Sequence, residues 1–153
     1  MAAQEPGDEE IVARLRSAGP AEVAALRAAV DEVRRAAAAG PLSSWPAPRG
    51  DGSAANPLGW PRPVYHPSVL RLDDALAAVR ACPIPFDWRN WAEVPRLSTP
   101  AAVSAASLAD AARLVTALLR AERFTDGIIG SALESGILLA AADRILAGLA
   151  AAR

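Results

Sequence analysis

The sequence predicts an all-α protein of one domain, in which five or six helices pack around an apolar C-terminal helix. Three observations support this fold class. A chain of 153 residues has the usual size of one domain. About a quarter of the residues are alanine, which has the highest helix propensity. Apolar residues also recur at intervals of three and four along several stretches, as on the buried face of a helix. We therefore expect residues 1–153 to form a single helical domain.

The N-terminal part predicts two helices. We expect residues 1–7 to be disordered and a short helix to follow, because acidic residues begin the stretch 8–16 and arginines end it. Pro20 suits the first turn of a second helix, which Gly40 and Pro41 end. This second helix carries a one-sided apolar stripe of Val23, Leu26, Val30, Val33 and Ala37. So narrow a stripe suits pairing with another helix, including one from a partner.

Residues 40–63 predict a long irregular loop, because they are rich in Pro and Gly and show no periodicity. The segment also contains Trp45 and Trp60, which a flexible linker would not need. We expect these two indoles to pack the ends of the loop over the core. A mobile tip near 49–56 would lie between them.

Residues 64–82 begin extended before Pro67 and then predict a helix with a regular apolar face. Two prolines separate this helix from an aromatic segment. There, Asp87 is placed to cap one helical turn, on which Trp88 and Trp91 would lie on the same side.

The last third predicts the centre of the domain. A helix is expected from Leu108 to Arg123, with Ser107 as its N-cap. From Gly127 onward the chain is apolar around most of a helical circumference, which is typical of an interior helix. We expect one continuous central helix there.

Composition excludes several function classes. The net charge of −1 argues against a dedicated nucleic-acid surface. One Cys and one His exclude an intramolecular disulfide and a Cys/His zinc site, so we predict no metal and no cofactor. The acidic leader is unlike a signal peptide, and the longest apolar run is too short to cross a bilayer. We therefore predict a cytoplasmic protein without membrane contact. All sixteen basic residues are Arg, which suggests the coding bias of a GC-rich bacterium.

Two stretches, "FDWRNW" and "LLRAERFTDGIIGSALESGILLAAADRIL", resemble a family of uncharacterised bacterial small proteins that is known only as a domain of unknown function. The resemblance covers roughly residues 60–148 and implies no activity. Its residues here are Tyr65, Phe86, Asp87, Trp88, Trp91, Arg120, Arg123, Phe124, Gly127, Glu134 and Gly136.

The aromatic cluster has two interpretations. Burying one large aromatic removes about 150 to 250 Å² from water, so Phe86, Trp88 and Trp91 would supply much of an alanine-packed core. The alternative is a surface for a ligand or partner, with Arg89, Asn90 and Glu93 at its rim. Asp87 and Tyr65 are further candidate binding residues.

Glu134 is the most informative polar residue. It would share a helix face with apolar residues, so we expect either an ion pair with Arg123 or Arg120, or an exposed edge position. The alternative is a site carboxylate joined by Asp126. His66 is the one conventional proton-transfer group, although a lone His is more often a surface or hydrogen-bonded residue.

The function is not evident from the sequence. Because no catalytic constellation is recognisable, we expect a non-enzymatic interaction module that binds a protein partner or a second copy of itself. The alternative is a small-molecule-binding protein or small enzyme. Its pocket would lie around Glu134 beneath an aromatic cap, with Asp126, Arg123 and His66 or Asp87 contributing.

Overall fold

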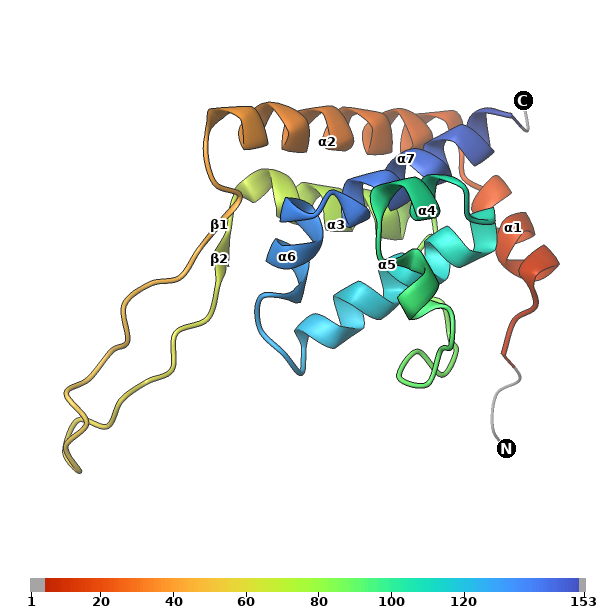
Figure 1. Cartoon of the computed structure of the whole chain (residues 1–153). Coiled ribbons are helices and arrows are strands. Elements are labelled where there is room, and N and C mark those ends of the chain that lie inside the picture. Colours follow the sequence, from red (N-terminus) through yellow and green to blue (C-terminus); the bar gives the residue numbers. More distant parts are fainter. Residues whose placement is uncertain (1–4, 152–153) are drawn as a thin grey trace.

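The computed structural model, which describes residues 5–151, is a helical bundle from which one long arm projects (Figure 1). Its first three helices are α1 (Asp8–Arg16), α2 (Pro20–Ala39) and α3 (Pro67–Ala78). The later part contains a 3₁₀ helix, η1 (Val94–Leu97), and then α4 (Pro100–Ser104), α5 (Leu108–Glu122), α6 (Ile128–Glu134) and α7 (Ile137–Ala150). The all-α, single-domain prediction is confirmed, although the described residues form seven α-helices rather than five or six.

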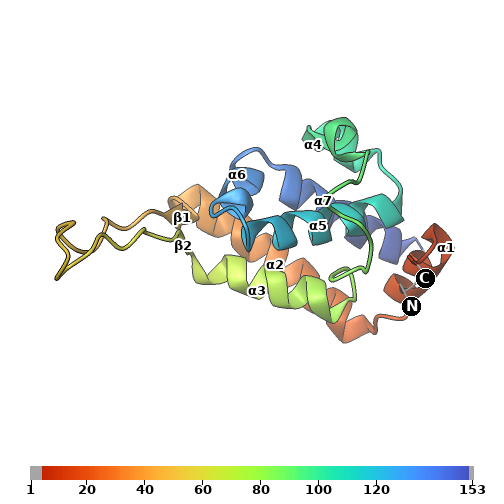
Figure 2. The ribbon, with the colours of Figure 1, turned by 90° about the horizontal axis from the view of Figure 1, so that it is seen from below.

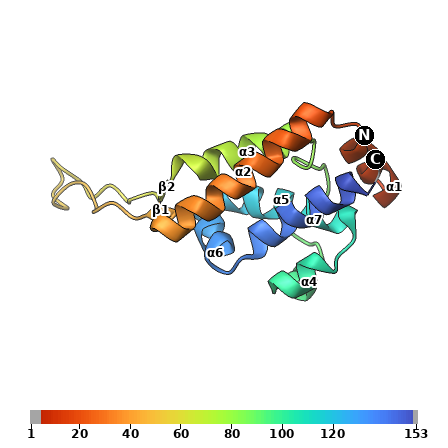
Figure 3. The same cartoon turned by 90° about the horizontal axis from the view of Figure 1, so that it is seen from above.

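Helix α7 forms the centre of the bundle, as the sequence predicts. It packs against α2, α4, α5 and α6, and Figure 3 shows it between α2 and α4. Its buried side chains are Leu138, Ala140, Ala141, Ala142, Ile145, Leu146 and Leu149. Three of these are alanines in succession, so neighbouring helices can approach α7 closely on more than one side.

The apolar C-terminal stretch is not one continuous helix, so that prediction is wrong. Gly136 separates α6 from α7 and has a φ of 79°, in the left-handed region that favours glycine. Gly127, before α6, has a φ of 93°. Apolar periodicity alone did not reveal the break, because both helices bury apolar residues.

The apolar stripe of α2 lies inside the bundle. Val23, Leu26, Val30 and Val33 are all buried, and α2 packs against α3 and α7. Figure 2 shows α2 and α3 side by side. The stripe therefore pairs with helices of its own chain and is not open to a partner helix.

Residues 45–63 form the projecting arm, which starts from a short antiparallel ladder. Strand β1 (Ser43–Ser44) pairs with β2 (Val64–Tyr65), and farther out Arg49 pairs with Gly59. Trp60 is 89% exposed, so the prediction that both indoles pack over the core is wrong. Trp45 is 55% exposed, although one edge of its ring lies against Gly127 at the start of α6. The two segments pair with each other and run away from the bundle (Figure 1). The mobility predicted for the tip near 49–56 stays a prediction.

The N-terminal segment touches the aromatic region. The carboxylate of Glu5 accepts a hydrogen bond from the backbone N–H of Asp87 at 2.6 Å, and the Pro6 carbonyl accepts one from Arg113 at 3.3 Å. The disorder predicted for residues 1–7 falls mainly on 1–4, which lie outside the described residues. None of the described helices combines the length and the apolar character needed to cross a membrane.

Candidate functional site

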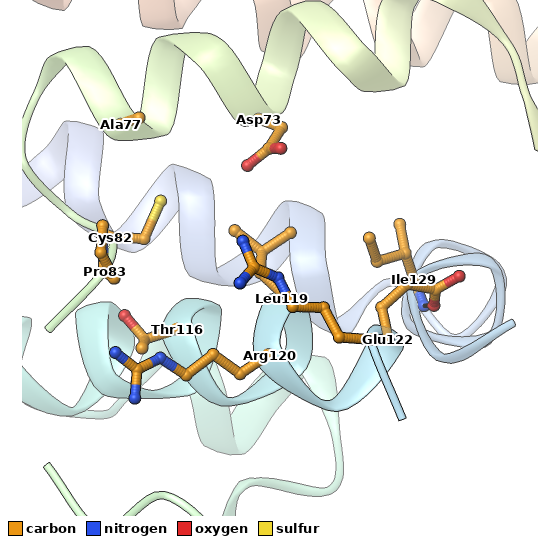
Figure 4. Close-up of a pocket in the computed structure, with 10 residues that line it drawn as sticks. Asp73, Ala77, Cys82, Pro83, Thr116, Leu119, Arg120, Glu122 and Ile129 are labelled. Carbon is orange, nitrogen blue, oxygen red and sulfur yellow. Dashed lines mark hydrogen bonds between the residues drawn. The ribbon is translucent and has the colours of Figure 1, made fainter. Parts of the chain in front are cut away.

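A cavity of about 380 Å³ lies between α3 and α5. Figure 4 shows Asp73 on α3 facing α5, with Cys82 and Pro83 at one end and Glu122 and Ile129 at the other. Its lining residues are Asp73, Ala77, Cys82, Pro83, Thr116, Leu119, Arg120, Glu122, Arg123 and Ile129. We call this space the α3/α5 cavity. It has the size and the mixture of apolar walls and few polar groups that small-molecule sites commonly have.

Two arginines line this cavity without an acidic partner. Arg120 is half-buried and Arg123 is exposed, and within residues 5–151 neither makes an ion pair or a side-chain hydrogen bond. By contrast, Arg113 is also half-buried but pairs with Asp8 at 2.6 Å and with Asp110 at 3.3 Å. No described side-chain nitrogen is both buried and unbonded, so the guanidinium donors of Arg120 open to the cavity or to solvent. They are available to an anion.

Asp73 supplies a negative charge on the opposite wall. Burial, together with the neighbouring charge of Asp74, raises the pKa of Asp73, while the positive charge of Arg123 acts in the other direction. The carboxylate and the two guanidinium groups thus face one cavity without forming a closed ion pair. A ligand with separated charges could satisfy both walls.

The cavity also contains two groups that are occupied or unreactive. The Thr116 hydroxyl is buried, accepts from the Ile84 backbone N–H at 3.0 Å and donates to the Ala81 carbonyl at 3.5 Å. Burial raises the pKa of the Cys82 thiol to about 12. The thiol therefore stays protonated near neutral pH and is a poor nucleophile.

Tyr65 and Glu122 fix the edge of the cavity where α5 leads into α6. The Tyr65 hydroxyl donates to Glu122 Oε1 at 2.7 Å. The same carboxylate accepts the backbone N–H groups of Gly127 and Ile129 at 3.1 and 2.8 Å, which lie at the start of α6. Burial and the bond to Glu122 raise the pKa of Tyr65. This network holds Arg123 and Ile129 on either side of a fixed turn.

The aromatic segment forms two separate pairs. Phe86 and Trp91 meet edge to face at a centroid distance of 5.6 Å and pack on the core as half-buried residues. Trp88 stacks on Phe124 at 5.9 Å, and the Arg89 guanidinium lies 4.7 Å from the Phe124 ring centroid.

The helical turn predicted after Asp87 is wrong. Residues 88–93 form turns instead, and the carboxylate of Asp87 accepts from the Asn90 side chain at 2.7 Å. The one helical element of this segment begins later, at Val94, so the helix periodicity does not apply to Trp88 and Trp91.

Glu134 and Asp126 do not join Arg123 in one pocket. Glu134 is exposed at the end of α6 and lines a different cavity, between α6 and the segment after α2. Asp126 is exposed in the turn before α6 and lines neither cavity. The ion pair expected between Glu134 and Arg123 or Arg120 is absent from the described residues, and the exposed edge position is the one observed.

His66 has a structural role as the N-cap of α3. Its Nδ1 accepts from the Ser68 backbone N–H at 3.2 Å and lies 2.9 Å from the Ser68 hydroxyl. Among the described residues, no three His, Cys, Asp or Glu side chains gather as metal ligands would.

The structure thus joins Tyr65 and Arg123 at one site and places the other sequence candidates around it or elsewhere. Glu122 was not predicted as a site residue, and the sequence suggested Asp73 only as a weak metal ligand together with Asp74 and His66. The i to i+3 spacing of Arg120 and Arg123 around Glu122 was a usable signal, because it puts both arginines on one side of α5. Asp73 faces these arginines because of how α3 packs, and no local sequence pattern indicates this.

No curated protein and no solved structure matches this chain. One family model matches residues 19–150, a span that includes every element of the bundle except α1. Eight residues of the earlier resemblance lie in or directly beside the α3/α5 cavity and the aromatic pairs: Tyr65, Phe86, Trp88, Trp91, Arg120, Arg123, Phe124 and Gly127. The chain therefore belongs to the family of unknown function called DUF6508.

Proposed function

We propose that the protein binds a small anionic molecule, such as a carboxylate or a phosphate ester, in the α3/α5 cavity. The observation that carries the proposal is the pair of cavity-lining arginines, Arg120 and Arg123, without an acidic partner in residues 5–151. Arginine presents several donors in a planar fork that fits both anions. Leu119, Ile129 and Ala77 supply apolar walls for the remainder of the ligand.

Asp73 refines the class of ligand. A carboxylate opposite two arginines favours a molecule that also carries an ammonium or hydroxyl donor. Binding fits the cavity better than catalysis, because the Cys82 thiol stays protonated and Glu122 already accepts three hydrogen bonds. The sequence suggested a small-molecule pocket around Glu134, whereas this proposal assigns the binding site to the α3/α5 cavity. The cytoplasmic location remains a prediction.

Thermal-shift measurements with monocarboxylates, amino acids and sugar phosphates test the proposal. We expect at least one class to raise the melting temperature of the wild-type protein, and Arg120→Gln and Arg123→Gln each to abolish that shift. Arg27→Gln is the matched control, because Arg27 is exposed on α2, does not line the cavity and makes no ion pair within the described residues. No shift with any class, or an undiminished shift in both cavity variants, would overturn the proposal.

A further inference from the structure

The arm, residues 45–63, is an ordered extension that adds nothing to the hydrophobic core. None of its side chains belongs to the core cluster. It nevertheless has its own internal bonds: Gly59 N–H donates to the Arg49 carbonyl at 2.7 Å, and Asp51 accepts from the Ser53 N–H at 2.9 Å. A structured element outside the core needs a reason other than folding of the bundle.

The arm exposes several large apolar side chains. Trp60 is 89% exposed, and Trp45 and Leu58 are each more than half exposed. Arg49 and Arg62 line a shallow hollow beside Trp60 and have no ion pair within residues 5–151. Trp and Arg are the residue types most enriched where proteins bind one another, so this surface suits a protein partner.

A complementary groove lies at the foot of the same arm. It has a volume of about 300 Å³ and lies between α6 and the chain that leads from α2 into β1. Its lining is mostly apolar: Ala37, Gly40, Pro41, Leu42, Ser43, Gly130 and Leu133. Glu134 is the one charged residue of the lining and makes no ion pair among the described residues. We call this space the foot groove.

The arm runs outward from the bundle (Figure 1), and no residue of 45–63 lines the foot groove of its own chain. The arm of a second copy, related by a two-fold axis beside the arm, can reach this groove. Trp60 is four residues from β2, or about 13 Å along an extended chain, so it lies close to the foot of the arm. A two-fold axis beside the arm would therefore pass close to both Trp60 and the foot groove. Self-complementary patches of this kind close as symmetric dimers.

We propose that two copies of this chain exchange arms, so that Trp60 of each copy occupies the foot groove of the other. Arg62 pairs with Glu134 across the interface, which joins an unpaired cation of the arm to the unpaired carboxylate of the groove. A second copy is favoured over another protein because one chain carries both the donor surface and its charge-matched acceptor.

Sedimentation and light scattering over the micromolar range test this proposal. We expect a dimer for the wild-type protein and an association at least about tenfold weaker for Trp60→Ala, since indoles at interface centres are often dominant. Leu70→Ala is the matched control, because Leu70 is 58% exposed on α3 but lies outside the arm and the groove.

Charge reversal makes the test specific. Arg62→Glu and Glu134→Arg should each weaken the dimer, and the double variant should restore it, whereas circular dichroism should stay unchanged in all three. A monomer at every concentration would overturn the proposal. So would a dimer that Trp60→Ala leaves intact, or a double variant no tighter than its single parents.

Discussion

Glu122 contributes more hydrogen bonds to the site than its neighbours on α5. Its carboxylate accepts one hydroxyl and two backbone N–H groups, and so connects β2, α5 and the start of α6. A carboxylate so used cannot also be a free catalytic base. It positions the turn that follows Arg123.

Replacing Glu122 by Gln should lower the free energy of unfolding by about 1–3 kcal/mol, because the new amide nitrogen would oppose a backbone or hydroxyl donor. Urea denaturation measures this. Asp126→Asn is the control, since Asp126 is exposed and makes no side-chain hydrogen bond or ion pair among the described residues, and it should stay near the wild-type value. Equal stability of both variants would contradict the bonding role of Glu122.

Asp73 should cost stability in the absence of ligand. Its folded pKa lies above the ordinary value of 3.8, mainly because the carboxylate is partly withdrawn from water at the cavity wall, although the residue as a whole is exposed. The protonated carboxyl group therefore carries no stability penalty at a pH below 3.8. The folded state loses stability relative to the unfolded chain as the pH rises through the folded pKa. Asp73→Asn should raise the melting temperature near pH 7, and this gain should disappear near pH 3. A variant less stable than wild type near pH 7 would contradict the assignment.

The pH dependence at the alkaline end should come partly from Cys82. Its thiol has a pKa of about 12 in the folded protein and an ordinary value of 9.0. The unfolded chain therefore loses this proton first, so stability is full below about 9 and falls as the pH rises toward 12. Chemical denaturation at several pH values should show that decline, and Cys82→Ala should make it shallower. An unchanged slope would exclude Cys82 as a cause.

At the scale of elements, periodicity predicted the long helices well. Helices α2, α5 and α7 each bury a regular apolar face. The N-cap Ser107 and the first-turn Pro20 lie where the sequence predicts them. Short elements were harder. The aromatic turn and the break at Gly136 depend on backbone conformations that a pattern of apolar residues does not encode.

Gly136→Ala should destabilise the protein by about 1–2 kcal/mol, because a side chain at a φ of 79° is strained and its Cβ would lie 3.3 Å from Pro100 Cγ. Thermal or urea denaturation measures the loss. Gly7→Ala is the matched control, with a φ of −69° and no atom within 4 Å of the added Cβ. A continuous α6–α7 helix in solution would instead make Gly136→Ala stabilising.

At the scale of the molecule, the bundle could be predicted because its interior comes from local helix faces. The cavity could be predicted only in part. Arg123 was predicted as a site residue, but its opposition to Asp73 across the cavity arises from the packing of α3 against the rest of the bundle. The arm was assigned as a loop, since prolines conceal strand pairing that involves only two residues on each side.

Replacing residues 46–61 by a short turn should leave the free energy of unfolding of the monomer within about 0.5 kcal/mol of wild type, because no core side chain is lost. Leu26→Ala, which empties a fully buried position of α2, should cost about 2–5 kcal/mol in the same urea titration. A large loss on shortening the arm would show that it supports the bundle.

The two ends of the bundle differ, because the arm projects from one end and the chain termini lie at the other (Figures 1 and 3). Both ends of the described chain lie on the side remote from the arm (Figures 1 and 3). Fluorophores or fusion partners attached at either end would therefore leave the arm and the foot groove uncovered. In a pair joined through the arms, such labels would sit at the far extremities, so energy transfer between them should be weak even when association is complete.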